Sequence, residues 1–416
     1  MADGEVLAGC IAKAGFQLAA SEGEADVLIY NTCAVKGPTE NRVLNVLKHA
    51  PKGKKLVVAG CLPLINFERL CREVRFDGAV GPSIGKRVVD VVTRVASGER
   101  VVDLKDLNRK PKLDLPRIKS NPVVSVVPIS YGCLGACAYC CVVFARGRLR
   151  SDSIKEIADR VQSDVADGAQ EVWITSQDTA CYGRDLHSNL AELLQALVDL
   201  PGDFKVRVGM MTPNMVTDMQ DRLIDAFESD KVFKFLHLPV QSGDDETLMR
   251  MRRFYTTAEF KGIVNSFRAQ FPDLTLATDV IVGFPGETEQ AFEKTLKLLE
   301  EVKPDVTNVS KFFVRPRTAA AQMQKSLVAQ EDVKSRSTAA AEQAKRISLD
   351  RNLSWVGWAG EVLVDEKGKV EDSWVGRNFA YKPIVVKSAE NLLGKMVKAK
   401  VVEASKTYLK GAIVEI

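Results

Sequence analysis

The sequence predicts an α/β protein of three parts: an N-terminal doubly wound parallel sheet, a central partial (βα)6 barrel and a small C-terminal antiparallel β-barrel. Short apolar strands alternate with helical patterns over the first hundred residues, as in a parallel sheet built from βαβ units. The same alternation continues on a larger scale to about residue 314. After residue 355 the pattern changes to short strands separated by Gly, Lys and Asn turns.

Length and composition limit the class of protein. The chain has 416 residues, which is too long for a single hydrophobic core, so several domains are expected. With 46% hydrophobic and 27% charged residues, it has the composition of a globular protein. No apolar run is long enough to cross a bilayer, and the start "MADGEVLAG" lacks the features of a signal peptide, so we expect a cytoplasmic protein with no membrane partner. The net charge of +4 permits a nucleic-acid partner without requiring one.

The N-terminal domain is expected at residues 1–100. Cys33 and Cys61 each close an apolar strand, and because the carboxyl ends of parallel strands share one edge, we expect these two residues to lie together. Residues 101–122 are charged and punctuated by prolines, which indicates a linker. The expected elements are helices at 4–16 and 38–50 and strands at 25–33 and 54–61.

The barrel is expected at residues 123–355 and the small C-terminal domain at 356–416. An alanine-rich, charged stretch at 330–353 is typical of a long surface helix and is expected to bridge two domains. The active site of such a barrel belongs at the carboxyl ends of its strands. The six strand candidates lie within 123–130, 171–178, 204–211, 233–240, 274–284 and 305–314.

Four of the nine cysteines lie close together after the first barrel strand. Cys133, Cys137 and Cys140 form a C-x3-C-x2-C pattern, which can hold three irons of a 4Fe-4S cluster and leave the fourth iron open to a substrate. Zinc is the alternative, but the three histidines are scattered through the chain. Cys141 adjoins Cys140, and neighbouring positions rarely aim at one centre, so it is expected to be a small buried residue.

Several other residues are expected to have packing roles. Cys71 and Cys181 show no ligand spacing and are expected in packing positions. His237 lies inside a strand and is expected to be a satisfied core histidine, and Asp279 is allowed a structural role.

The cysteine loop, with Tyr139 before its last cysteine, resembles the loop of the radical S-adenosylmethionine (SAM) superfamily. Longer stretches are similar to the methylthiotransferases that modify tRNA, above all the archaeal and eukaryotic type that acts on N6-threonylcarbamoyladenosine. The resemblance covers nearly the whole chain, with a methylthiotransferase domain, a radical-SAM barrel and a C-terminal TRAM domain in order. The stretches that carry it are "YNTCAVKGPTENRV", "GCLGACAYCCVVFARGRLRS", "EVWITSQDTACYG", "LHLPVQSGDDETLMRMRRFYT", "TDVIVGFPGETEQAF" and "GRNFAYKPIVV".

The resemblance implies a transferase that inserts a methylthio group at C2 of the adenine ring beside the anticodon. SAM would bind the open iron, and one electron from the cluster would cleave it to methionine and a 5′-deoxyadenosyl radical. A second SAM would supply the methyl group, to a sulfur held on an auxiliary 4Fe-4S cluster in the N-terminal domain.

The resemblance also implies ligands for the auxiliary cluster. Cys33 and Cys61 match its second and third ligands, whereas the family's first lies in a "YGC"-like strand upstream of this chain's opening segment. The cluster is therefore expected to be incomplete and the sheet to open at or near its middle, with a truncated chain and a misplaced start codon both left open. Cys10 could replace the ligand, but it shares a helical stripe with Val6, Leu7 and Ile11, which favours the core.

Residues at the strand ends are expected to bind SAM. Asp178 is allowed a capping role instead, as are Ser242 and Asp244 after the fourth strand. Glycines in "GFPGET" would let the backbone approach adenine, with a plain turn as the alternative. The expected SAM-binding residues are Tyr139, Ser176, Gln177, Gln241, Gly283, Phe284 and Pro285.

RNA contacts are expected at two basic motifs. "FARGRLRS" places arginines beside the cluster loop, where RNA phosphate or substrate contact competes with an ordinary solvated run. "GRNFAYKP" combines aromatic residues that stack with cations that hold phosphate, with a hairpin turn around Asn378 as the competing account. The expected RNA-binding residues are Arg146, Arg148, Arg377, Phe379, Tyr381 and Lys382, with Arg150 in the same run as the first two.

Two other functions stay open at this point. One is a radical-SAM methylthiotransferase for another tRNA base or a ribosomal protein. The other is an RNA-binding iron-sulfur protein without radical catalysis. The sulfur donor, the electron donor, the set of tRNAs and the oligomeric state cannot be derived from the sequence.

Overall fold

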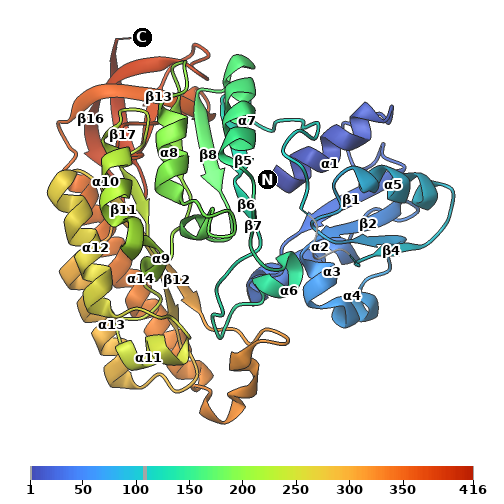
Figure 1. Ribbon diagram of the computed structural model, residues 1–416, viewed down its shortest axis with the longest axis horizontal. Helices are drawn as coiled ribbons and strands as arrows, with labels where there is room; N and C mark the ends of the chain where they lie inside the picture. Colours follow the sequence, from blue (N-terminus) through green and yellow to red (C-terminus); the bar gives the residue numbers. More distant parts are fainter. Residues whose placement is uncertain (1, 106–109, 416) are drawn as a thin grey trace. The chain divides into compact units, whose positions relative to one another are not determined.

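The computed structural model describes residues 2–105 and 110–415, which form two compact units (Figure 1). Unit 1 consists of Met1–Ser120, Ser130–Asp152 and Phe313–Gln322, and unit 2 of Asn121–Ile129, Ser153–Phe312 and Met323–Ile416. The segment with four cysteines therefore belongs to unit 1, although the first barrel strand, β5 (Val124–Pro128), belongs to unit 2.

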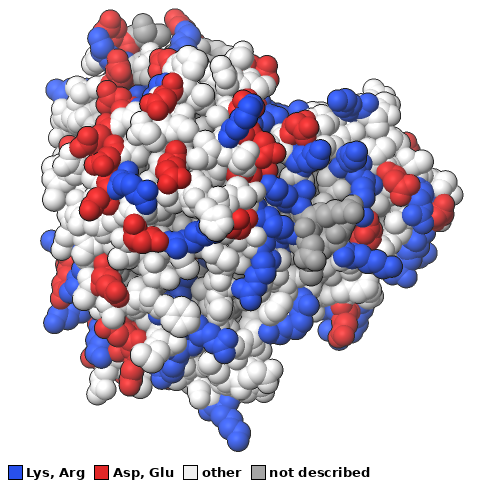
Figure 2. Space-filling view, viewed as in Figure 1, with Lys and Arg blue, Asp and Glu red and all other residues white. Residues whose placement is uncertain are grey.

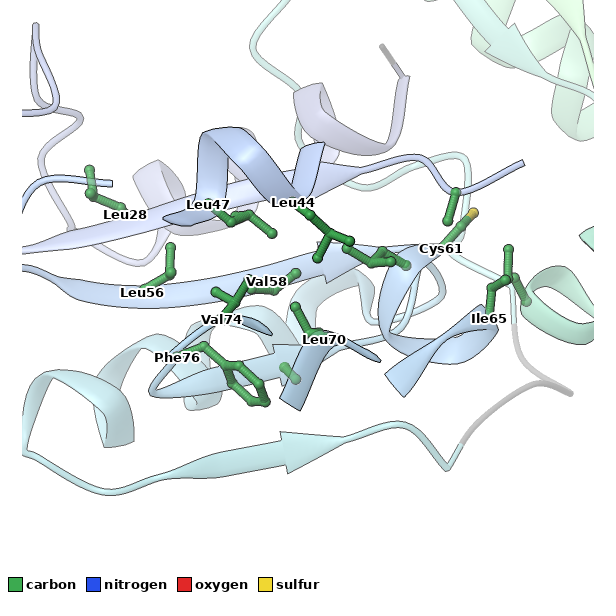
Figure 3. Close-up of a cluster of buried hydrophobic side chains, with 14 of the residues drawn as sticks. Leu28, Leu44, Leu47, Leu56, Val58, Cys61, Ile65, Leu70, Val74 and Phe76 are labelled. Carbon is green, nitrogen blue, oxygen red and sulfur yellow. The ribbon is translucent and has the colours of Figure 1, made fainter. Parts of the chain in front are cut away.

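Unit 1 contains a parallel four-stranded sheet with helices on both faces. Side chains alternate along its second strand: Leu56 and Val58 pack in the cluster shown in Figure 3, and Val57 and Ala59 pack in a second cluster on the opposite face. This arrangement confirms the predicted doubly wound sheet. In sheet order the strands are β1 (Val27–Thr32), β2 (Lys55–Gly60), β3 (Gly78–Val80) and β4 (Val101–Asp103).

The helices of unit 1 divide between these two clusters. The cluster of Figure 3 receives side chains from α2 (Gly37–Lys48), α3 (Leu62–Ile65) and α4 (Phe67–Glu73). The other receives them from α1 (Ala2–Lys13) and α5 (Val88–Ala96).

Two expectations for this sheet are wrong. β1 and β2 are paired from Val27↔Lys55 to Thr32↔Gly60, so the described strands form a sheet without a gap at this point. The predicted linker 101–122 begins with β4, where buried Val101 pairs with Gly78. A three-residue edge strand before a charged segment has too few residues to show a period. Residues 106–109 of that segment lie outside the described residues.

Unit 2 contains six parallel strands in chain order. Backbone hydrogen bonds from Phe233 N to Val206 O (3.0 Å) and from Met211 N to His237 O (2.9 Å) connect two three-stranded sheets. This confirms the predicted partial (βα)6 barrel. The sheets are β5 (Val124–Pro128), β8 (Glu171–Thr175) and β9 (Lys205–Val208), and β10 (Phe235–His237), β11 (Thr275–Val282) and β12 (Val306–Lys311).

Helices follow the strands of unit 2 as the sequence predicts. Two of them begin with a capping box, in which Ser153 pairs with Glu156 and Thr256 with Glu259. The helices are α7 (Ile154–Ala166), α8 (Leu190–Val198), α9 (Pro213–Val216), α10 (Gln220–Glu228), α11 (Asp245–Arg250), α12 (Thr257–Gln270), α13 (Glu289–Val302) and α14 (Gln330–Leu353).

The last five strands form a closed barrel in the order β13-β14-β15-β17-β16. Its pairs are antiparallel except for β15 and β17, which run parallel where Ile384 meets Leu409. α14 contacts both β12 and β16, so it links the six-stranded part of unit 2 to this terminal barrel, as predicted. The strands are β13 (Ala359–Lys367), β14 (Ser373–Arg377), β15 (Pro383–Lys387), β16 (Met396–Ala404) and β17 (Leu409–Glu415).

Membrane insertion through a helix finds no support in the described ranges. None of the helices there combines the length and the apolar character that a bilayer crossing needs.

A buried acidic pair joins the terminal barrel to β8. Glu171 and Asp365 are both buried and lie near enough to affect each other's pKa, and Arg377 Nε donates to Asp365 Oδ2 at 3.1 Å. Burial, together with the nearby charge of Asp365, raises the pKa of Glu171 to about 7. The folded protein therefore favours a protonated carboxyl group here.

Glu171→Gln tests this pair. A folded-state pKa raised to about 7 makes a contribution to stability that is complete below about pH 4 and is lost as the pH rises through 7. We expect the wild-type melting temperature to fall between about pH 4.5 and about pH 7.5, and the neutral variant to lose this component, which is of the order of 1–3 kcal/mol. Glu192→Gln on the exposed face of α8 is the control. Equal pH dependence in wild type and Glu171→Gln would contradict the assignment.

Candidate functional site

The cysteine loop, residues 132–149, is closed at its base within unit 1. Two short strands, β6 (Ser130–Tyr131) and β7 (Arg150–Ser151), pair antiparallel there. Gly132 has a φ of 81°, and a Cβ at this position would lie 2.2 Å from the carbonyl oxygen of Arg148. Only glycine fits such a close approach, so the backbone itself determines where the loop begins.

The three predicted cluster ligands are neighbours on this loop. A Cβ at Gly135 would lie 3.2 Å from Cys133 Sγ and 3.6 Å from Cys137 Sγ, so these two sulfurs flank the glycine. Gly135 N also donates to Cys133 Sγ at 3.1 Å. Burial, together with the nearby sulfurs of Cys137 and Cys133, raises the pKa of Cys140 to about 12.

This donor set fits an iron-sulfur cluster chemically, because thiolates are soft ligands suited to iron. Across residues 2–105 and 110–415, however, no three Cys, His, Asp or Glu side chains converge closely enough to hold a metal ion. Binding would release protons from the thiols and draw them together. The ligand assignment therefore stays a prediction, supported by the shared loop and by the sulfurs of Cys133 and Cys137 on either side of Gly135.

The remaining cysteines divide between core and surface. Cys141 is fully buried in the cluster of Figure 3, just before α6 (Val142–Arg146), and its sulfur lies 3.8 Å from Ala34 O. Cys181 is also fully buried, so both packing predictions are confirmed. The packing prediction for Cys71 is wrong, since this residue is exposed on α4.

Cys33 and Cys61 meet at the carboxyl edge of the sheet in unit 1. Cys61 N donates to Thr32 O at 2.9 Å, which ties the exit of β2 to the last residue of β1. Burial raises the pKa of Cys61, and Cys33 is near enough for its charge to raise it further. The predicted meeting of the two residues is therefore confirmed. Cys10 is buried on α1 beside Leu7, in agreement with the core interpretation.

Arg146, predicted to contact RNA, is instead largely enclosed within unit 1. Its guanidinium lies 2.5 Å from Asp3 Oδ2 and 4.8 Å from the centre of the Tyr131 ring, and it hydrogen-bonds Cys61. These contacts occupy most of the guanidinium, and the side chain is only 18% exposed, so the structure gives Arg146 an internal role in place of the predicted RNA contact. Arg148 is exposed, and its RNA role stays a prediction.

Sequence reasoning missed the partners that give Arg146 this place. Asp3 comes from α1 and carries no motif signal, because nothing local distinguishes it from other acidic residues of a first helical turn. Tyr131 had a usable signal, since it directly precedes the glycine of the cluster motif.

In unit 2, two polar residues follow β8. Ser176 and Gln177 are partly exposed, as a ligand contact requires. Asp178 takes the capping role instead of the expected SAM contact: its Oδ1 accepts hydrogen bonds from Ala180 N (3.2 Å) and Thr212 N (3.0 Å). Its carboxylate connects two strand exits and is buried in doing so.

Gln241 follows β10 in a left-handed conformation, with a φ of 70°. Such backbone strain in a residue other than glycine is most often found at functional positions. Its N donates to Asp279 O at 2.8 Å, and the Asp279 carboxylate lies 2.8 Å from His237 Nε2. His237 is therefore a satisfied histidine, as predicted, and Asp244 caps α11.

The "GFPGET" loop follows β11, and its side chains point inward. Phe284 is fully buried with its ring 5.4 Å from that of Phe312, and Pro285 is buried too. Gly283 has a φ of 77°, and a Cβ there would lie 2.4 Å from Val333 Cγ2 on α14. Packing against α14 thus accounts for this glycine, and the side chain of Phe284 cannot contact SAM.

Three RNA-binding predictions in "GRNFAYKP" are also corrected. Lys382 is buried with its Nζ 2.8 Å from Asp305 Oδ1, and Tyr381 hydrogen-bonds Glu171. Arg377 is ion-paired as described above. Contact with phosphate would require these buried pairs to open, whereas Phe379, 42% exposed, stays available to a base.

Comparison with protein families finds three matching profiles. Residues 127–299 match the Radical SAM superfamily, residues 1–81 match "Uncharacterized protein family UPF0004", and residues 356–414 match the TRAM domain.

Curated relatives match over nearly the whole chain. A protein of Pyrococcus horikoshii named "Probable threonylcarbamoyladenosine tRNA methylthiotransferase" is 39% identical, over 99% of this chain and 96% of its own length. A Homo sapiens protein named "Threonylcarbamoyladenosine tRNA methylthiotransferase" is 37% identical, over 98% of this chain and 71% of its own length.

A solved structure shares the fold. The radical S-adenosylmethionine methyltransferase TsrM from Kitasatospora setae, with tryptophan and a SAM analogue bound, aligns with a TM-score of 0.53 at 14% identity. The alignment covers 75% of this chain and 66% of that one.

Gly283→Ala tests the packing of the "GFPGET" loop on α14. The added Cβ would clash with Val333 in a backbone conformation that disfavours alanine, so we expect a loss of roughly 2–4 kcal/mol in the free energy of unfolding, measured by chemical denaturation. Gly262→Ala is the matched control, because Gly262 lies on α12 with open space around it and should gain about 0.5–1 kcal/mol. Similar effects of the two changes would refute this account of Gly283.

Proposed function

Since this chain belongs to the threonylcarbamoyladenosine tRNA methylthiotransferase family, we propose that it transfers a methylthio group to C2 of N6-threonylcarbamoyladenosine, beside the anticodon of tRNA. The relatives with that activity in their name match the chain almost from end to end. The observation that carries the proposal is the C-x3-C-x2-C loop with its three neighbouring sulfurs. The enzyme is a radical SAM transferase.

Cys133, Cys137 and Cys140 would hold the 4Fe-4S cluster that binds SAM. When bound, the cluster and SAM supply a one-electron cleavage whose radical product activates the adenine ring. The protein's part is to place donors around the cofactor: the N–H of Gly135 already points at a ligand sulfur. The residues proposed to bind SAM are Tyr139, Ser176, Gln177 and Gln241, with the backbone at Gly283 to Pro285.

An auxiliary 4Fe-4S cluster is proposed at the carboxyl edge of the sheet in unit 1. Cys33 and Cys61 would be two of its ligands, and their proximity supports this. Arg146 donates to Cys61 and is held by Asp3, so a cation stands beside the sulfur that would carry negative charge.

The partner is tRNA, and the proposed location is the cytoplasm. The C-terminal match to the TRAM domain supports an RNA-binding role for the terminal barrel. Exposed Phe379 and Arg148 remain the proposed RNA contacts. Lys and Arg gather, interspersed with Asp and Glu, on the face of unit 1 shown in Figure 2, which suits an anionic partner.

Cys137→Ala tests the role of the cysteine loop. After anaerobic reconstitution with iron and sulfide, we expect the variant to lose the cluster at this loop and to form no 5′-deoxyadenosine from SAM and dithionite. Cys141→Ala is the matched control, because its sulfur is buried in the core and should leave both readouts intact. Equal losses in the two variants would contradict the ligand assignment. Loss of tRNA affinity together with 5′-deoxyadenosine in Cys137→Ala would indicate a structural cluster.

Nucleoside analysis tests the substrate. tRNA from cells that lack the gene should contain N6-threonylcarbamoyladenosine without its 2-methylthio group, and the wild-type gene should restore the group. Persistence of the methylthio nucleoside in the deletion strain would contradict the substrate assignment. It would favour another tRNA base or a ribosomal protein as the target.

A further inference from the structure

Two large apolar side chains stand out near the end of α11: Met249 lies in its last turn and Phe254 on the loop that leads to α12. Met249 is 75% exposed and Phe254 is 72% exposed, more than any other large hydrophobic residue in the described ranges. Arg252 lies between them in the chain and is also exposed. We call Met249, Arg252 and Phe254 the α11–α12 platform. An exposed aromatic ring beside a free cation is the combination that single-stranded nucleic acids bind.

The platform is held rigidly, because alternate residues of the loop are buried. Met251, Arg253 and Tyr255 point into unit 2. Tyr255 Oη donates to Val240 O at 2.8 Å, and Arg253 Nε donates to Tyr255 Oη at 3.2 Å. The alternation leaves the residues between them directed outward. A rigid aromatic surface loses little conformational entropy when a base stacks on it.

The backbone at Arg252 is strained. Arg252 N donates to Met249 O and Arg253 N to Leu248 O, both at 2.9 Å, which is the Schellman pattern that ends α11. Its left-handed position, with a φ of 57°, favours glycine. Arginine occupies this position, and its side chain is exposed.

The platform lies near the carboxyl ends of the parallel strands of unit 2, where the active site of a barrel enzyme is expected. The carbonyl that Tyr255 contacts belongs to Val240, which directly precedes Gln241 at the exit of β10. Arg250 reaches toward the next loop, since its Nη1 would lie 3.0 Å from a Cβ at Gly286. The α11–α12 platform therefore adjoins the exits of β10 and β11.

We propose that the α11–α12 platform binds an unpaired nucleotide of the tRNA substrate, next to the adenosine that is modified. The base stacks on Phe254 against Met249, and its phosphate contacts Arg252. Paired bases cannot use this surface, because stacking on a protein ring requires a base free of its helix. The inference rests on the proposed function, and it adds a determinant of substrate specificity outside the terminal barrel.

Phe254→Leu and Phe254→Tyr test the stacking contact. The leucine keeps an apolar group without an aromatic face, and the tyrosine keeps the face. Fluorescence anisotropy with an anticodon stem-loop RNA should show a roughly 5- to 100-fold weaker Kd for leucine and a near wild-type Kd for tyrosine. A fully base-paired RNA of the same length should bind both variants as it binds wild type. Leu186→Ala, on another exposed loop of unit 2, is the control.

Arg252→Gly tests the phosphate contact without endangering the fold. Glycine relieves the left-handed strain, so the melting temperature should hold or rise while affinity for the stem-loop falls. The slope of log K against log salt should shrink by about 0.7, the value for one phosphate of a single strand. Arg222→Ala on α10 should leave the slope unchanged.

The outcomes separate the platform from the proposed function. SAM cleavage by wild-type protein tests the radical chemistry alone, whatever the platform does. Unchanged stem-loop affinity in both Phe254→Leu and Arg252→Gly overturns the platform. Equal weakening by leucine and tyrosine, or equal loss with paired RNA, also overturns base stacking and indicates a different partner for this surface.

Discussion

Parallel strand pairing is the constraint on which the candidate site depends. A parallel strand cannot return through a tight turn, so each strand must leave the sheet at its carboxyl end and cross back through a helix. The loops that carry candidate functional residues in each unit therefore follow the carboxyl ends of strands. Cys33 and Cys61 do so in unit 1, and Gln241 and the "GFPGET" loop do so in unit 2. The α11–α12 platform is one step further along the same kind of connection.

Buried charge decides which polar residues stay available for ligands. Glu171, Asp305 and Asp365 draw Arg377 and Lys382 into the interior of unit 2, where each pair is hydrogen-bonded. Such pairs contribute little net stability, because desolvation offsets most of their attraction, but breaking one leaves a charge without its partner. These buried pairs favour a single arrangement of the terminal barrel against β8 and β12. Because they are paired in this way, the side chains of Arg377 and Lys382 are not available to contact RNA.

Several predictions failed for one physical reason: the partner of a charged side chain is not encoded near it. The runs "FARGRLRS" and "GRNFAYKP" have the composition of nucleic-acid surfaces, yet Arg146 meets Asp3 and Lys382 meets Asp305. A periodic hydrophobic pattern also needs several residues before it can be recognised, and β4 has only three. Longer apolar strands and the helix at 330–353 lay where their periodicity placed them.

The sequence alone predicts the elements and the chemistry of the cysteine motif, because hydrophobic period and ligand spacing are local properties. It also placed Cys33 and Cys61 together, since parallel topology follows from the order of strands and helices. Other features depend on the folded chain: Val333 packs where a side chain at position 283 would lie, and Arg146 lies beside Cys61. Phe254 and Met249 stay exposed in the fold. Burial and charge pairing join residues far apart in the chain, and they exist only once the fold has brought those residues into contact.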